Sequence, residues 1–125
     1  MKVPAETGEF LLVEKKSKFI AVLFRVDTEQ AAMDRLKETR AAHKKASHNC
    51  YAYRVGNATR YGDDGEPKGT AGMPIYEVLR REDIQNALCV VTRYFGGTLL
   101  GRGGLVRAYV AAAKGAVVSA GTETL

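Results

Sequence analysis

Hydrophobic and polar positions alternate in several short segments, which predicts strands. Residues 9–16 and 17–26 form two extended segments joined by a lysine-rich step that suits a hairpin. Residues 48–55 alternate in the same way, and residues 86–94 predict a fourth strand. Because residues 17–26 are apolar on both faces, we expect this strand to be central in the sheet and covered on both sides.

Helical periodicity fills the intervals between these strands. Asp27 is placed as an N-cap, with Gln30 in the capping-box position, which predicts a helix over residues 28–45. Pro74 suits the first turn of a short second helix, and residues 56–72 before it predict a long, turn-rich loop. The last helix carries its apolar stripe on Leu105, Ala108, Tyr109, Ala112 and Ala116.

The order of these elements, ββαβαβα, predicts an α+β fold. We expect a two-layer sandwich in which a four-stranded sheet is backed by helices. The chain has 125 residues, which corresponds to one domain, and its 46% apolar and 26% charged residues are typical of a globular protein. Its apolar stretches are too short to span a membrane, and its N-terminus does not resemble a signal peptide.

The two cysteines, Cys50 and Cys89, lie far apart in the sequence and outside any CxxC spacing. A structural zinc site needs four ligands at short spacing, so we expect no such metal site. Two buried free thiols in a reducing compartment are the natural expectation, which predicts a cytoplasmic protein. We expect no cofactor.

Charge is segregated along the sequence. Nineteen basic and fourteen acidic residues give a net charge of +5, yet residues 39–62 and 84–122 contain no acid at all. Such basic segments suit an anionic partner, although solvated helix ends explain them as well. The bases of the two segments are Arg40, Lys44, Lys45, Arg54, Arg60, Arg93, Arg102, Arg107 and Lys114.

An acidic loop after the third predicted strand has two interpretations. Three carboxylates within four residues suit the binding of a divalent cation through oxygen ligands, although the EF-hand spacing is absent. The same carboxylates suit capping of the next helix through its N-terminal amides. The residues that define this loop are Asp63, Asp64, Gly65, Glu66 and Thr70.

A glycine-rich loop precedes the last helix, with five glycines in residues 96–104, among them Gly96, Gly97 and Gly101. Its amides suit a phosphate, whereas tight packing of the loop against the sheet explains the glycines almost as well. Arg102 and Gly103 stand where a P-loop has Lys and Ser or Thr, so nucleotide hydrolysis through this loop is not expected.

No catalytic set is evident in the sequence. His48 and Cys50 share a strand face, but same-face neighbours lie about 7 Å apart, too far for a thiolate–imidazole pair. Aromatic rings interleaved with bases, by contrast, suit nucleic acid, because the rings stack on nucleobases while the charges hold phosphates. The candidate nucleic-acid-binding residues are Arg54, Arg60, Arg93, Tyr94, Phe95, Arg102 and Arg107.

Four motifs, in order, resemble the IMPACT/YigZ family over residues 8–121. They are EKKSKFIA at 14–21, HxCxAYR at 48–54, DGEPxGTAG at 64–72 and VTRYFGGxxLGxGGLVRAY at 91–109. The resemblance implies a single IMPACT/YigZ-type domain over residues 1–125 with an ordered core at about 8–121. It also implies the ribosomal-protein-S-five domain-2-like fold, similar to domain IV of elongation factor G.

The same resemblance carries functional expectations. It implies contact with ribosomal or other structured RNA, and eukaryotic relatives act in translational control by binding the activator of a general-control kinase. The family supplies no established reaction. Bacterial members usually carry a second, ferredoxin-like domain, so the chain is either a single-domain member or one domain of a longer protein.

Three hypotheses for function follow. The leading one is a non-enzymatic RNA- or ribosome-associated domain in translational regulation or the stress response. The second is a phosphate- or nucleotide-binding enzyme that uses the loops at residues 63–66 and 96–104. The third is a protein-interaction module whose partner is a translation-control protein. None of the three requires a membrane.

Overall fold

The computed structural model describes all 125 residues, Met1–Leu125, and has the predicted α+β composition. Every strand and helix expected from the hydrophobic pattern is present, and three short strands are added to them. The elements are β1 (Lys2–Pro4), β2 (Gly8–Glu14), β3 (Ser17–Arg25), α1 (Glu29–Ala42), β4 (His48–Val55), β5 (Ala58–Gly62), α2 (Gly72–Arg81), β6 (Ala87–Tyr94), α3 (Gly101–Ala120) and β7 (Thr122–Thr124).

The main sheet has five strands in the order β2-β3-β6-β4-β5, with every neighbouring pair antiparallel. The prediction of four strands was therefore wrong, because β5 lies within the segment that we expected to be a loop. The sequence of β5, ATRYG, has no apolar alternation, because none of its residues is buried in the core. β3 lies inside the sheet, between β2 and β6, as predicted; the middle strand is β6, which is buried almost throughout.

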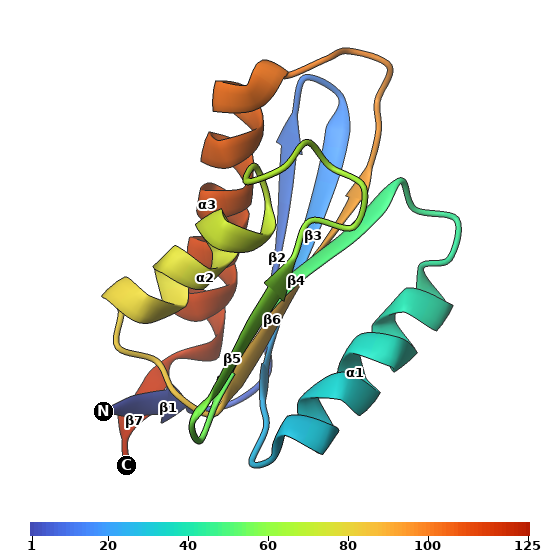
Figure 1. Cartoon of the computed structure of the whole chain (residues 1–125). Helices are drawn as coiled ribbons and strands as arrows, with labels where there is room; N and C mark the ends of the chain where they lie inside the picture. Colours follow the sequence, from blue (N-terminus) through green and yellow to red (C-terminus); the bar gives the residue numbers. More distant parts are fainter.

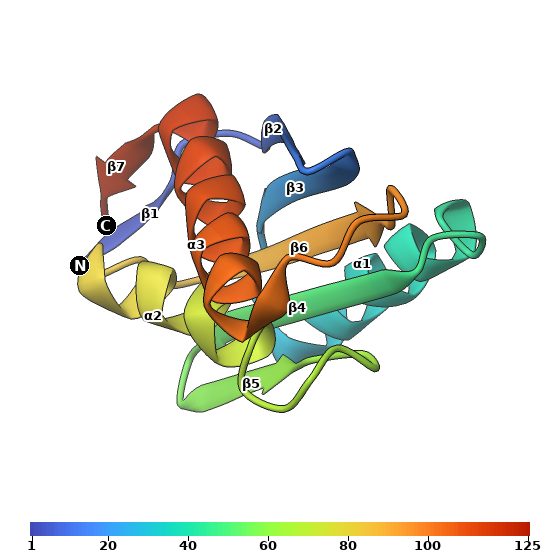
Figure 2. The same ribbon diagram turned by 90° about the horizontal axis from the view of Figure 1, so that it is seen from above.

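Helices cover both faces of this sheet (Figures 1 and 2). α2 and α3 enclose the larger core of 22 residues on one face, and α1 encloses a smaller core of eight residues on the other. The molecule thus has three layers where two were predicted. Periodicity identifies the buried stripe of a helix but does not tell which face of the sheet that stripe covers.

Local signals were accurate to within a few residues. Thr28, not Asp27, is the N-cap of α1, and its hydroxyl accepts a hydrogen bond from the backbone N–H of Ala31 at 3.0 Å. All five residues of the predicted stripe on α3 are buried, and so are the two free cysteines. None of the helices combines the length and the apolar character that crossing a bilayer requires.

One end of the molecule gathers most of the sequence motifs. The β2–β3 turn, the start of β4, the end of β6 and the start of α3 all lie there, at the top of Figure 1. The β5–α2 and β6–α3 connections pass over the same end. We call this region the loop end.

Candidate functional site

The two loops singled out from the sequence meet at the loop end. Arg102 at the start of α3 donates a hydrogen bond of 2.6 Å to the carbonyl of Lys68 in the β5–α2 loop. Gly96 lies directly on the β2–β3 turn, where a Cβ would stand 2.1 Å from the carbonyl carbon of Lys16. Only glycine fits at this position, so close packing explains this part of the glycine-rich loop.

A buried ion pair lies beneath these loops. The side chains of Glu66 and Arg93 are 2% and 6% exposed, and Nη1 of Arg93 donates to both carboxylate oxygens at 3.0 and 3.1 Å. The Nε and Nη2 atoms of Arg93 donate to Ser17 Oγ at 3.4 and 3.3 Å. The guanidinium therefore has its partners inside the protein and offers no free charge to a phosphate.

The carboxylate of Glu66 has further partners from other elements. Tyr109 of α3 donates its hydroxyl hydrogen to Glu66, and Nε2 of His48 lies 3.4 Å from the other carboxylate oxygen. The pKa of Tyr109 lies well above its ordinary value, because the hydroxyl is buried and has Cys50 and Glu66 beside it. We call this set, Ser17, His48, Glu66, Arg93 and Tyr109, the ionic lock.

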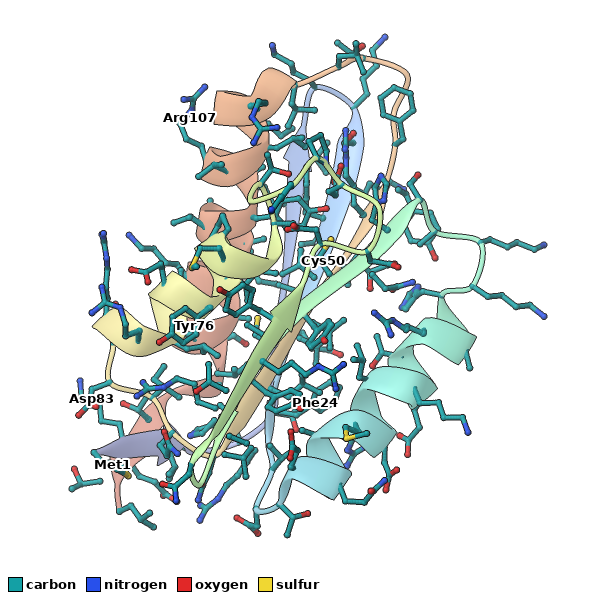
Figure 3. The ribbon with its side chains drawn as sticks, in the orientation of Figure 1. Met1, Phe24, Cys50, Tyr76, Asp83 and Arg107 are labelled. Carbon is teal, nitrogen blue, oxygen red and sulfur yellow. The ribbon has the colours of Figure 1, made fainter.

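His48 and Cys50 serve structure at this site. Nδ1 of His48 lies 2.8 Å from the carbonyl oxygen of Asp64. A carbonyl oxygen only accepts, so Nδ1 is the donor of this hydrogen bond. The thiol of Cys50 donates to the carbonyl of Asp63 at 3.1 Å, and burial raises the pKa of this thiol. Cys50 is labelled in Figure 3, inside the molecule on β4.

The three carboxylates of the acidic loop turn to different partners. Asp63 accepts hydrogen bonds from the backbone N–H groups of Gly69, Ala71 and Gly72 at 2.8–3.2 Å, and so caps the start of α2. Asp64 accepts one from the N–H of Asn49 at 2.7 Å, and Glu66 belongs to the ionic lock. No group of three His, Cys, Asp or Glu side chains is placed to hold a metal ion. The geometry therefore favours the capping interpretation.

Hydrogen bonding also sets the acidity of Asp63. Partial burial alone would raise the pKa of this carboxyl group. The three backbone N–H donors and the nearby Arg102 together outweigh that effect and hold the pKa of Asp63 below its ordinary value. The carboxylate is therefore charged at neutral pH and faces the positive end of α2.

Above the lock, two hollows lie on either side of Phe95, whose side chain is 47% exposed. The first has a volume of about 420 Å³, and we call it the lysine groove; it is lined by Lys16, Lys18, Ile20, His43, Tyr94 and Phe95. The second, of about 430 Å³, lies between the two loops, where Glu66 is the only acid among its lining residues. The Phe95 ring lies between these hollows with the Arg93 guanidinium 5.4 Å from its centroid.

Five of the predicted nucleic-acid-binding residues lie at the loop end, and two lie elsewhere. Tyr94 and Phe95 line the lysine groove, and Arg102 and Arg107 are exposed at the start of α3. Figure 3 shows Arg107 at the loop end. Arg93 is buried in the lock. The other two lie elsewhere: Arg54 donates to the carbonyls of Leu79 and Ile84, and Arg60 lies on the edge strand β5.

Sequence reasoning missed other residues at the loop end. Lys16 and Lys18 line the groove, yet they lie outside the two acid-free segments, in a shorter stretch without acids at residues 15–26. The run Lys-Lys-Ser-Lys at the hairpin was the available signal. Nothing in a single sequence indicated that Ser17 would meet Arg93 or that Tyr109 would meet Glu66, since these contacts span 76 and 43 positions along the chain.

Comparisons with known proteins place the chain among relatives of similar sequence. A family model for the Impact N-terminal domain matches residues 15–117. The chain is 49% identical over 107 residues to the IMPACT family member YvyE of Bacillus subtilis, covering 83% of this chain and 49% of YvyE. It is 40% identical over 112 residues to the IMPACT family member YigZ of Escherichia coli, covering 86% of this chain and 55% of YigZ.

Two solved structures share the fold. A crystal structure of a hypothetical protein aligns with a TM-score of 0.93 and 36% identity, over 98% of this chain and 62% of that one. The two-domain translational regulator Yih1 aligns with a TM-score of 0.56 and 27% identity, over 94% of this chain and 46% of Yih1. The chain spans about half the length of the curated relatives it matches. It belongs to the IMPACT family through its Impact N-terminal domain.

Proposed function

We propose that this domain is a non-enzymatic RNA-binding module that acts in translational regulation. The observation that carries the proposal is the lysine groove, in which two exposed cations flank two aromatic rings. The family and its relative Yih1, described as a translational regulator, support the biological setting.

The groove has the chemistry that unpaired RNA requires. A nucleobase stacks on the exposed face of Phe95, while Lys16 and Lys18 contact the phosphates beside it. More cations lie on segments that meet at or near the loop end. They are Lys15 on the same hairpin, Lys44 and Lys45 on the turn before β4, and Arg102 and Arg107 on α3, all exposed.

Salt dependence of binding tests this proposal. We expect a short RNA hairpin with an unpaired loop to bind the protein with a log–log slope of affinity against salt of roughly −2 to −4, which corresponds to three to five phosphates. The variant to compare is K16G/K18T. Lys16 has a φ of 69°, so glycine keeps the turn without strain, and threonine suits the strand position of Lys18.

The K16G/K18T variant should bind RNA more weakly, with a slope less steep by about 1 to 2. The control is K37Q/K114Q, which removes the same charge from exposed positions in the middle of α1 and α3. It should keep the wild-type slope. Equal losses of RNA affinity in the two variants would mean that binding responds to net charge alone. The absence of RNA binding by the wild-type protein at low salt would refute the proposal.

The geometry does not favour the enzymatic alternative. A phosphate-transfer site would need carboxylates facing the glycine-rich loop, but Asp63 and Asp64 are bonded to backbone amides of the protein. Glu66 does line the hollow between the loops, yet it is neutralised by Arg93. If the RNA test fails, a protein partner of the same exposed surface becomes the hypothesis to examine.

A further inference from the structure

The two edges of the five-stranded sheet are protected very differently. β5 is short, at five residues, and carries the exposed Arg60. β2 has seven residues without proline; its charged residues, Glu9 and Glu14, lie near its two ends, and Leu11 and Val13 between them are 56% and 57% exposed. Natural edge strands are usually shortened, charged or covered to prevent pairing with another chain, so β2 is the unprotected edge.

Hydrogen-bond alternation shows which groups of β2 are unpaired. Glu14 and Ser17 close the two-residue turn and are paired across it, so even-numbered residues of β2 bond to β3. The backbone groups of Glu9, Leu11 and Val13 therefore point to the free edge. The N–H of Glu9 is satisfied by Ser119 Oγ at 3.2 Å. Leu11 and Val13 have no backbone partner in the protein.

We propose that β2 pairs antiparallel with β2 of a second copy of this chain, about a two-fold axis at Leu12. In this register Leu11 lies opposite the partner's Val13, and Glu9 lies opposite the partner's Lys15, the turn residue that directly follows the strand. The four free backbone groups of Leu11 and Val13 are then satisfied in both copies. A two-fold interface must be self-complementary, and this register joins apolar to apolar and acid to base.

Other registers match less well. With the axis at Leu11, Glu9 lies opposite the partner's Val13, and with the axis at Val13, Leu11 lies opposite the partner's Lys15. A shift by one residue would oppose outward-facing and inward-facing backbone groups. Above the strands, α3 packs over both β2 and β3, so pairing would also bring the two copies of α3 side by side.

Analytical ultracentrifugation across a concentration series tests the pairing directly. We expect the mass to rise from 13.6 kDa towards twice that value as concentration increases. L11K should remain monomeric, because it adds like charges to the interface while its exposed position leaves the fold intact. V13P should also remain monomeric, since it removes an outward-pointing N–H and leaves the β2–β3 ladder unchanged. Circular dichroism verifies that both variants fold.

Charge exchange tests the register itself. In a dimer of E9K, each introduced lysine lies opposite the partner's Lys15. In a dimer of K15E, each introduced glutamate lies opposite the partner's Glu9. Each variant alone should therefore dimerise more weakly than wild type. A mixture of E9K and K15E should dimerise again, because every pair is then of opposite charge. If β2 instead paired with a strand of a different protein, mixing E9K with K15E would not restore the association.

Hydrogen exchange adds a residue-level readout. The amides of Leu11 and Val13 should exchange more slowly as concentration rises, whereas that of Leu12 should not change. A mass that stays monomeric at high concentration would overturn the proposal. So would a dimer that L11K and the charge variants leave unaffected. The pairing does not depend on RNA binding, and the two are tested by different residues, because K16G/K18T removes cations of the groove but leaves Glu9 and Lys15 in place.

Discussion

The ionic lock and the lysine groove are neighbours at the loop end, yet they use charge in opposite ways. In the lock, Glu66 and Arg93 are almost fully buried and bonded to each other. In the groove, Lys16 and Lys18 face solvent beside Phe95. The residues that stand out most in the sequence are thus the ones that hold the loops together. The surface proposed to bind RNA includes Lys16 and Lys18, which belong to the first motif but were not among the predicted binding residues.

The largest expected effect comes from breaking the lock. R93M leaves the buried carboxylate of Glu66 without its counter-ion, so we expect the free energy of unfolding to fall by about 3 to 5 kcal/mol. That is a large share of the roughly 5 to 15 kcal/mol that holds a domain of this size folded. Urea unfolding followed by circular dichroism measures the change.

The matched control is R35M on α1. Arg35 forms an exposed pair with Glu38 at 3.5 Å, and such surface pairs contribute at most about 1 kcal/mol. Equal losses of stability in R93M and R35M would show that the lock is not a stabilising element.

A second prediction concerns the aromatic ring of the groove. F95L keeps an apolar side chain over Arg93 but removes the face on which a base would stack. We expect RNA binding to weaken by about 1 to 3 kcal/mol, the usual contribution of one stacked base. Leu99 is 81% exposed on the same connection, and L99A serves as the control with wild-type affinity. Wild-type RNA affinity in F95L would exclude stacking on this ring.

The smallest effect concerns the acidic loop. D63N loses the charge that caps α2 and should cost about 1 to 2 kcal/mol of stability at neutral pH. Because the pKa of Asp63 is lowered in the folded protein, its stabilisation is present above the pKa of the unfolded chain and lost as pH falls through the folded value. Wild-type stability should therefore decline more steeply than that of D63N below about pH 5. Parallel pH profiles would argue against this role.

Much of the fold was readable from sequence, because each apolar segment carries its own period. β4 was predicted over its full length, and the buried stripe of α3 was predicted residue by residue. β5 was missed because none of its five residues is buried, so its sequence carries no core-facing alternation to detect. The third layer was missed because the side of the sheet that α1 covers depends on the path of the whole chain.

The candidate site was predicted less completely. The two loops were expected as possible partners, and they do meet through Arg102 and the backbone of Lys68. The pairing of Arg93 with Glu66 depends on a sheet register that joins residues distant in sequence. Candidate basic residues were taken from the two acid-free segments at residues 39–62 and 84–122, which excluded Lys16 and Lys18 although both line the groove.

The most direct test of the central claim is the RNA affinity of R93M, measured where circular dichroism shows it folded and compared with K16G/K18T in the same titration. We expect R93M to bind within about threefold of wild type, a difference under 1 kcal/mol, while K16G/K18T loses affinity and salt dependence. If R93M lost as much affinity as K16G/K18T, the lock would itself belong to the binding surface, and the division between the two regions would be contradicted.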